Sequence, residues 1–266
     1  MHIVVCINHI PDPEAPAKTF ALDESTNRPA LSKTSRVIGP FDENALELAL
    51  KLKDATGAKL TALTLGPATN VDALRKALAT RADEAVHVKE DRAIELDSAA
   101  VATILAAAVR RLGDVDLVMS GRQVGDWDGG QVGQLLAEEL DLPCIALASQ
   151  IGMEGDRSIR VTREVPGGMA VVEADLPLVV TATNGPEGQL RIPKVKDVMA
   201  AHRAPITTWS AADLGLDIDR LAAQPTVSIQ RLFLPQSGAQ VELIRADSDD
   251  EIATELAKRI IGMKVV

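Results

Sequence analysis

The chain has 266 residues, of which 46% are hydrophobic and only 2% aromatic, and it contains no tyrosine. Its core must therefore be aliphatic, which is typical of a parallel sheet covered by helices on both faces. The formal net charge of −10 makes nucleic acid and anionic membranes poor partners for the surface as a whole.

The sequence indicates neither export nor membrane insertion. Its opening, MHIVVCINHIPD, reads as a short strand rather than a signal peptide. No apolar run approaches the roughly 20 residues of a membrane span. Cys6 and Cys144 each lie inside an apolar run, away from metal-ligand spacing, and are expected to be buried. We therefore expect a cytoplasmic protein, or a mitochondrial matrix protein in a eukaryote.

Strand and helix patterns alternate from the N-terminus to about residue 145. We expect strands at 2–7, 59–66, 84–89 and 115–121. A long polar connection, 11–36, follows the first strand. We expect helices whose caps or first residues are Asp42, Asn70, Asp97 and Gln131. This alternation predicts a doubly wound, mostly parallel, Rossmann-like α/β sheet.

The pattern changes after that point. SIRVTREV and MAVVEADLPLVVTAT are separated by PGG, which predicts a hairpin that adds antiparallel strands to the sheet edge. The later chain is irregular and ends in a helix at 249–261. We expect a nucleotide-binding α/β domain at 1–204, with a distinct segment at 184–204, and a C-terminal arm at 205–266. Scattered apolar residues in the arm favour a partner surface, with packing on its own domain as the alternative.

The most unusual stretch is SGRQVGDWDGGQVGQ, which holds five glycines between a predicted strand and a predicted helix. Ligands of open α/β sheets bind beyond the carboxyl ends of strands, and small residues there let backbone N–H groups converge on an anion. The positive end of the dipole of the following helix would strengthen the binding of such an anion. The stretch therefore predicts a phosphate cradle formed by Gly129, Gly130, Gln131, Val132 and Gly133. Arg122 offers a balancing charge. The alternative is a glycine-rich connection without a ligand.

The other side chains of this loop allow more than one interpretation. Asp126 and Asp128 suit hydrogen bonds from ribose hydroxyls or capping of the helix, and as a D-x-D pair they could bind magnesium. Otherwise they are solvated turn formers. Trp127 either stacks on an adenine or lies on the protein surface.

Three further segments are expected to face the same crevice, or else to be ordinary turns: 6–8, 39–42 and 65–67. The four histidines show no metal spacing, and no nucleophile elbow or Cys-x-x-Cys is present. His2 and His87 read as structural residues, and His9 and His202 as exposed ones. We therefore expect a chain that binds a nucleotide without reacting it, and no metal site.

Five segments, taken in order, resemble the beta subunit of electron transfer flavoproteins, including its nitrogen-fixation-associated branch. They are MHIVVCINHIPD, GPFDENALELALKLKD, LTLGPATNVDALRKALATRADEAVHV, DLVMSGRQVGDWDGGQVGQLLAEELDLP and RIPKVKDVMAAHR. The resemblance implies a heterodimer with an alpha subunit that holds the redox FAD, while the beta subunit shapes that site and buries one AMP.

Carried over by position, the resemblance assigns the AMP contacts to Cys6, Gly39, Pro40, Phe41, Asp42, Leu65, Gly121, Arg122, Gln123, Val124, Gly125, Asp126, Trp127, Asp128, Gly129, Gly130, Gln131 and Val132. It also places Phe41 near the flavin ring. The family usually has Asn where this chain has Gly39, and Lys where it has Asn8.

The resemblance further assigns residues 191–199 to a recognition loop that docks a transient dehydrogenase partner. Its residues are Arg191, Lys194, Val195, Lys196 and Met199, with Val195 as the apolar anchor. Electrons would then leave to an acceptor such as a quinone reductase.

Two rival interpretations stay open. In electron-bifurcating relatives a second FAD replaces the AMP, and these often read DGDTAQVGP where this chain reads DWDGGQVGQ. Because Trp127 replaces a glycine that borders the flavin entrance, AMP is favoured here. The other rival is a nucleotide-binding sensor that works without flavin.

Overall fold

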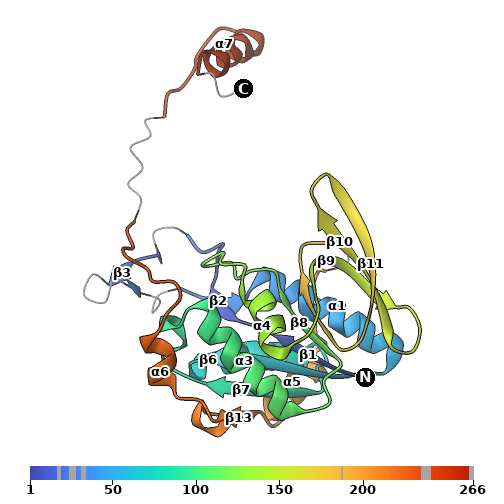
Figure 1. The fold of residues 1–266 in the computed structure, drawn as a ribbon. Helices are drawn as coiled ribbons and strands as arrows, with labels where there is room; N and C mark the ends of the chain where they lie inside the picture. Colours follow the sequence, from blue (N-terminus) through green and yellow to red (C-terminus); the bar gives the residue numbers. More distant parts are fainter. Residues whose placement is uncertain (17–18, 24–27, 31–33, 187, 235–240, 264–266) are drawn as a thin grey trace. The chain divides into compact units, whose positions relative to one another are not determined.

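The computed structural model describes residues 1–16, 19–23, 28–30, 34–186, 188–234 and 241–263. Contacts divide the chain into two units, Met1–Arg231 and Leu232–Val266 (Figure 1). Each unit is described by itself.

The first unit is built on a nine-stranded sheet in the order β11-β10-β9-β12-β8-β1-β6-β7-β13. The strands are β1 (His2–Cys6), β6 (Lys59–Gly66), β7 (Glu84–Lys89), β8 (Leu117–Gly121), β9 (Cys144–Met153), β10 (Ser158–Val165), β11 (Gly168–Asp175), β12 (Leu178–Ala182) and β13 (Thr207–Trp209). All neighbours pair in parallel except β10, which is antiparallel to β9 and β11. The mostly parallel sheet with an antiparallel edge hairpin is thereby confirmed.

Two short antiparallel ladders accompany the main sheet. They are β2 (His9–Pro11) with β5 (Arg36–Ile38), and β3 (Leu22–Asp23) with β4 (Arg28–Pro29). The helices of this unit are α1 (Pro40–Thr56), α2 (Val71–Ala79), α3 (Ser98–Leu112), α4 (Val132–Leu140), α5 (Val195–Arg203) and α6 (Ile218–Ala223).

Helices cover both faces of the sheet, as the aliphatic composition predicts. Ile3 and Val5 of β1 belong to a core cluster with Leu46 of α1, whereas Val4 belongs to a second cluster with Ile104 of α3. Successive residues of a strand point to opposite faces, so the two clusters are the two sides of a doubly wound sheet (Figure 1).

The α/β unit continues past residue 204, where we expected the domain to end. β13 pairs with β7, and Trp209, Leu214, Leu216, Ile218 and Leu221 pack against the second core cluster. Residues 205–231 therefore belong to the α/β unit by their contacts, and the second unit begins at Leu232.

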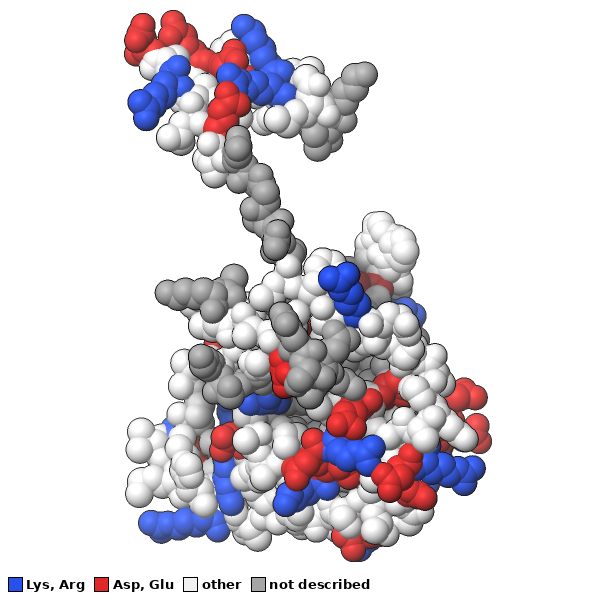
Figure 2. All heavy atoms as spheres, turned by 90° about the vertical axis from the view of Figure 1, so that its left-hand side faces the viewer, with Lys and Arg blue, Asp and Glu red and all other residues white. Residues whose placement is uncertain are grey.

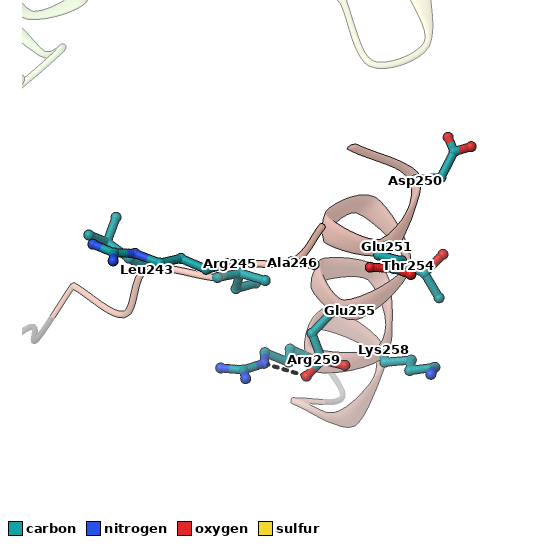
Figure 3. A pocket seen from close by; sticks show the side chains of 10 residues that line it. Leu243, Arg245, Ala246, Asp250, Glu251, Thr254, Glu255, Lys258 and Arg259 are labelled. Atoms are coloured by element: carbon teal, nitrogen blue, oxygen red, sulfur yellow. Dashed lines mark hydrogen bonds and ion pairs between the residues drawn. The ribbon is translucent and has the colours of Figure 1, made fainter. Parts of the chain in front are cut away.

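The second unit carries α7 (Asp249–Gly262), capped by Ser248, whose hydroxyl accepts from the Glu251 amide. Arg259 forms ion pairs with Glu255 and Glu242. Figure 3 shows the open groove between residues 243–246 and this helix, lined mostly by charged side chains.

Acidic and basic side chains are interspersed over the face of the α/β unit shown in Figure 2. Among the described residues, no helix has the length and apolar character required to cross a membrane.

Candidate functional site

The carboxyl ends of three neighbouring parallel strands form the core of the candidate site. β1 lies between β6 and β8, and the strands end at Cys6, Gly66 and Gly121. The loop after β8 and the start of α1 meet at this edge. The structure thus brings together the predicted residues of segments 6–8, 39–42, 65–67 and 121–133.

The side chain of Asp42 joins two of these strand ends. Its Oδ2 accepts a hydrogen bond from the Asn8 amide and its Oδ1 one from the Gly121 amide, both at 2.9 Å. The residue is only 5% exposed. Burial raises the pKa of its carboxyl group to about 7, although both hydrogen bonds act in the opposite direction.

The sequence led us to expect Asp42 as the N-cap of the first helix, and this expectation is wrong. α1 begins three residues earlier than that cap would require, at Pro40, with Gly39 as its N-cap and no side-chain cap bond. Proline suits the first helical position because it lacks an N–H and has a fixed φ. Asp42 is thereby placed in the first turn, where its carboxylate faces the strand ends.

Close packing explains the first glycines of the loop. A Cβ at Gly121 would lie 2.6 Å from Asp42 Oδ1, and one at Gly125 would lie 3.2 Å from Ile10 Cδ1. A Cβ at Gly39 would lie 3.0 Å from Asp42 Oδ2. A side chain at Gly121 would therefore force a rearrangement, whereas one at Gly39 or Gly125 would require its neighbours to shift by a few tenths of an ångström.

The second half of the loop, where the sequence predicts a phosphate cradle, leads into the start of α4. Asp128 and Gly130 adopt left-handed backbone conformations, with φ of 49° and 62°. The N-cap of α4, Gln131, makes no side-chain hydrogen bond to the helix. The first N–H groups of α4 therefore have no side-chain cap, and such groups bind phosphates well. A Cβ at Gly133 would lie 2.3 Å from Thr181 Cγ2, so the helix start is pressed onto β12.

The acidic residues of the loop bond within it. Gln123 Nε2 donates to Asp128 Oδ1 at 2.8 Å, and the Trp127 amide donates to Asp126 Oδ1 at 3.0 Å. Burial raises the pKa of Asp126. Trp127 is 41% exposed on the surface. In the described part of the chain, no three His, Cys, Asp or Glu side chains gather as a metal site would need.

Arg122 lies against Phe41 instead of pointing at the cradle. Its guanidinium carbon is 4.6 Å from the centre of the Phe41 ring. Its Nη1 lies 3.3 Å from Thr183 Oγ1 and 3.7 Å from Glu164 Oε2. Its Nε is buried, and among the described residues it has no hydrogen-bond partner. Sequence reasoning missed Glu164 and Thr183, since neither lies near the loop in the chain.

Two polar side chains support the end of β6. Asn70 Nδ2 donates to the Leu65 carbonyl at 3.0 Å, and His87 Nε2 lies 2.8 Å from the Gly66 carbonyl oxygen. Asn70 is the N-cap residue of α2, as expected, but its side chain makes no cap bond to the helix. Its Oδ1 is buried and accepts no hydrogen bond within the part of the chain that the structure describes. Both side chains thus fix the third strand end of the site.

His9 is buried, at 6% exposure, so the expectation of an exposed His9 is wrong. It lies in β2, and its carbonyl accepts from Arg36 Nη2. Burial, followed by the charge of Arg36, lowers the pKa of His9. His2 and His87 lie in strands and His202 is exposed, as expected. Cys6 is buried, whereas Cys144 is only partly buried.

The predicted recognition segment divides into an anchor and an exposed part. The Arg191 guanidinium forms ion pairs with Glu47, at 2.9 Å, and with Asp54, at 2.7 Å, and its amide also donates to Glu47. Beyond it, Ile192 is 93% exposed and Val195 is 78% exposed. Met199, Lys194 and Lys196 are also exposed. Arg191 therefore ties the segment to α1, and Ile192 is an exposed apolar residue that sequence reasoning missed.

Comparison with known proteins gives one consistent result. Residues 30–214 match the family described as "Electron transfer flavoprotein domain". The chain is 35% identical to "Protein FixA" of Azorhizobium caulinodans, over 97% of this chain and 95% of that protein. It is 33% identical to "Caffeyl-CoA reductase-Etf complex subunit CarD" of Acetobacterium woodii, over 98% of both. It is 32% identical to "Electron transfer flavoprotein subunit beta" of Megasphaera elsdenii, over 100% of both. The chain therefore belongs to the electron transfer flavoprotein family, and its similarity to a beta subunit of that family extends over its whole length.

Proposed function

We propose that this chain is the beta-type subunit of a heterodimeric electron transfer flavoprotein and that it binds one AMP in the site described above. Its alpha partner would hold the FAD that accepts electrons from a dehydrogenase and passes them to a quinone reductase-type acceptor. The FAD supplies the redox chemistry. The observation that carries the proposal is that the ends of β1, β6 and β8 lie side by side in the sheet, and that α4, after the loop that follows β8, begins without a side-chain cap.

The residues of this chain would bind and orient, without bond-breaking chemistry of their own. The amides that begin α4 would hold the phosphate, and the loop from Gly121 to Gly130 would follow the ribose and base. Asp42, Asn70 and His87 hold the strand ends in position for this. Small residues are needed because the nucleotide would lie against backbone.

A second candidate function is a subunit of a reductase complex in which FAD replaces AMP. The relative named as a subunit of a caffeyl-CoA reductase-Etf complex favours it, because its 33% identity nearly equals that of the first relative. Trp127 favours AMP, since its bulky ring stands in the loop next to Asp126 and Asp128.

The content of the co-produced heterodimer tests both candidates. The complex would be purified, denatured, and its nucleotides quantified by chromatography. One FAD and one AMP per heterodimer would support the carrier. Two FAD without AMP would support the reductase complex instead. AMP without any flavin would overturn electron transfer and leave a nucleotide-binding sensor.

We also propose that the segment from Ile192 to Met199 docks the dehydrogenase. Apolar side chains that are almost fully exposed to solvent mark interaction sites when they cluster. Lys194 and Lys196 beside them suit an acidic partner surface, which promotes rapid but transient association. The ion pair between Arg191 and Glu47 supports this proposal, because it holds the beginning of the exposed segment against α1.

The second unit, residues 232–266, is proposed to lie on the alpha subunit. Its exposed apolar side chains include Val241, Leu243, Ile261 and Met263. A surface of another chain would cover them.

A further inference from the structure

The segment proposed for docking contains α5, a short helix that has little apolar burial to hold it. All nine residues of α5 are described, and of them only Ala201 is buried. By contrast, α2, which packs beside it, buries four of its nine residues. A helix of this length is marginal in water, and most of its stability comes from tertiary packing. Polar contacts at the two ends of α5 are therefore important for keeping it folded in this place.

Arg75 of α2 holds the C-terminal end of α5. Its Nη1 donates to the carbonyl oxygens of Ala201 and Ala204, both at 2.5 Å. The last carbonyls of a helix have no partner within it, and the negative end of the helix dipole lies there, so a cation is a favourable donor. Pro205 follows directly and ends the helix. Ile206 then packs against the core cluster on the α1 side of the sheet.

Arg191 holds the other end of the segment. Its guanidinium forms ion pairs with Glu47 and Asp54 of α1. Glu47 is 4% exposed, and its charge would be costly to bury without this cation. Leu190, the preceding residue, packs against the core cluster on the α1 side. An arginine therefore fixes each end of the segment, one to α1 and one to α2.

The residues between the two attachments form an apolar centre with a basic rim. Ile192, Val195 and Met199 are the exposed apolar residues. Val195 and Met199 are four positions apart and lie on the same side of the helix. The exposed basic residues are Lys194, Lys196 and Arg203. In a chain with a net charge of −10, this local basic rim fits a partner whose surface is acidic.

We infer that Arg75 is a positioning residue for docking: it holds the C-terminal end of α5 and so keeps the apolar centre and its basic rim preformed for an acidic partner surface. This role rests on the docking proposed above for the same segment. Without Arg75, the partner would have to order α5 on binding, and the entropic cost would weaken the complex. The docked geometry, and with it the rate of electron transfer in the complex, would stay the same.

Two substitutions of Arg75 and a matched control test this role. Arg75→Gln removes the charge and the fork of N–H donors, whereas Arg75→Lys keeps a cation on a flexible stem. Arg110→Gln is the control, because Arg110 Nη2 likewise donates to a carbonyl near a helix end, that of Glu139 in α4. α3 and α4 pack on the opposite face of the sheet from α2.

Amide hydrogen exchange of residues 195–203 is measured on the co-produced heterodimer, together with steady-state reduction by its dehydrogenase. In Arg75→Gln we expect the amides of α5 to exchange about tenfold faster, because charge-assisted hydrogen bonds are lost. KM for the heterodimer should rise about fivefold while kcat stays at the wild-type value, because only binding includes the ordering of α5. Arg75→Lys should lie between Arg75→Gln and the wild type in both measurements, and Arg110→Gln should match the wild type.

Wild-type amide exchange of α5 in Arg75→Gln would overturn the role of Arg75, whatever the dehydrogenase does. A wild-type KM in Arg75→Gln together with a raised KM in Val195→Ala would also overturn it, because the segment would then dock without help from Arg75. A wild-type KM in both variants would instead overturn the docking itself, and with it the role that rests on it.

Discussion

At the scale of single residues, Asp42 links the stability of the protein to pH. Burial raises its pKa from 3.8 to about 7, so the folded state binds its proton more tightly than the unfolded chain does. The contribution of Asp42 to the free energy of unfolding is therefore complete below about pH 4 and is lost as the pH rises through 7. A shift of this size corresponds to a loss on the order of 4 kcal/mol.

Asp42→Asn tests this link, because the amide has no charge to desolvate. Urea unfolding from pH 4 to pH 8 should show the free energy of unfolding falling with pH in the wild type and changing less in the variant. His2 and His9, whose pKa values are lowered by burial, act in both proteins and cancel in the difference. Equal slopes would show that Asp42 does not titrate in this range.

A second prediction at this scale contrasts two glycines of the same loop. Gly133→Ala places a Cβ 2.3 Å from Thr181 Cγ2, whereas Gly129→Ala meets only Ser98 Oγ, at 3.7 Å. We expect Gly133→Ala to lower the free energy of unfolding by about 1–3 kcal/mol through overpacking. It should also lower the amount of bound nucleotide, because the start of α4 must move. The second should change the free energy of unfolding by less than about 0.5 kcal/mol. Similar urea midpoints and nucleotide contents in both variants would contradict the close packing.

At the scale of elements, the sequence predicts the regular parts well. The strand at 59–66 and the helix after Asp97 agree with β6 and α3, whose cap accepts from Ala100. Local signals suffice there, since hydrophobic periodicity and a capping residue act within one turn or strand.

Pairing between distant segments explains what sequence reasoning missed. His9 is buried because β2 pairs with β5, which follows a long connection, and β13 has only three residues, recognised by its pairing with β7. Arg191 meets Glu47 from 144 positions away. No sequence pattern within either segment indicates which distant segment it contacts. The loops of the candidate site could therefore be predicted, but the hydrogen bonds and ion pairs between them could not.

The recognition segment gives a prediction at the scale of an element. Val195→Ala should lower kcat/KM for reduction of the heterodimer by its dehydrogenase, by about tenfold, while flavin content stays unchanged. Loss of a central apolar contact has this size of effect in interfaces. Val171→Ala on β11 is the matched control, since Val171 is also exposed, at 61%. If the dehydrogenase reduces both variants at the wild-type rate, the segment does not dock the dehydrogenase.

At the scale of the whole molecule, the two units differ in what stabilises them. The α/β unit has two aliphatic core clusters, built from both faces of one sheet. In the second unit, α7 has 14 residues, none of which is buried. A helix of this length is marginal in water without tertiary packing, and about 40 residues is the lower limit for a chain that folds alone. The second unit should therefore gain its stability from a partner.

Truncation after Arg231 tests this division. The shortened chain should unfold within about 2 °C of the full chain, because no core residue is removed and surface changes alter stability little. It should, however, bind the alpha subunit far more weakly, since the exposed Val241, Leu243, Ile261 and Met263 are gone. Calorimetry and gel filtration of the co-produced chains measure the two effects. A truncated chain with a clearly lower unfolding temperature would show that the second unit stabilises the α/β unit. One that still assembles fully would show that the alpha subunit binds elsewhere on this chain.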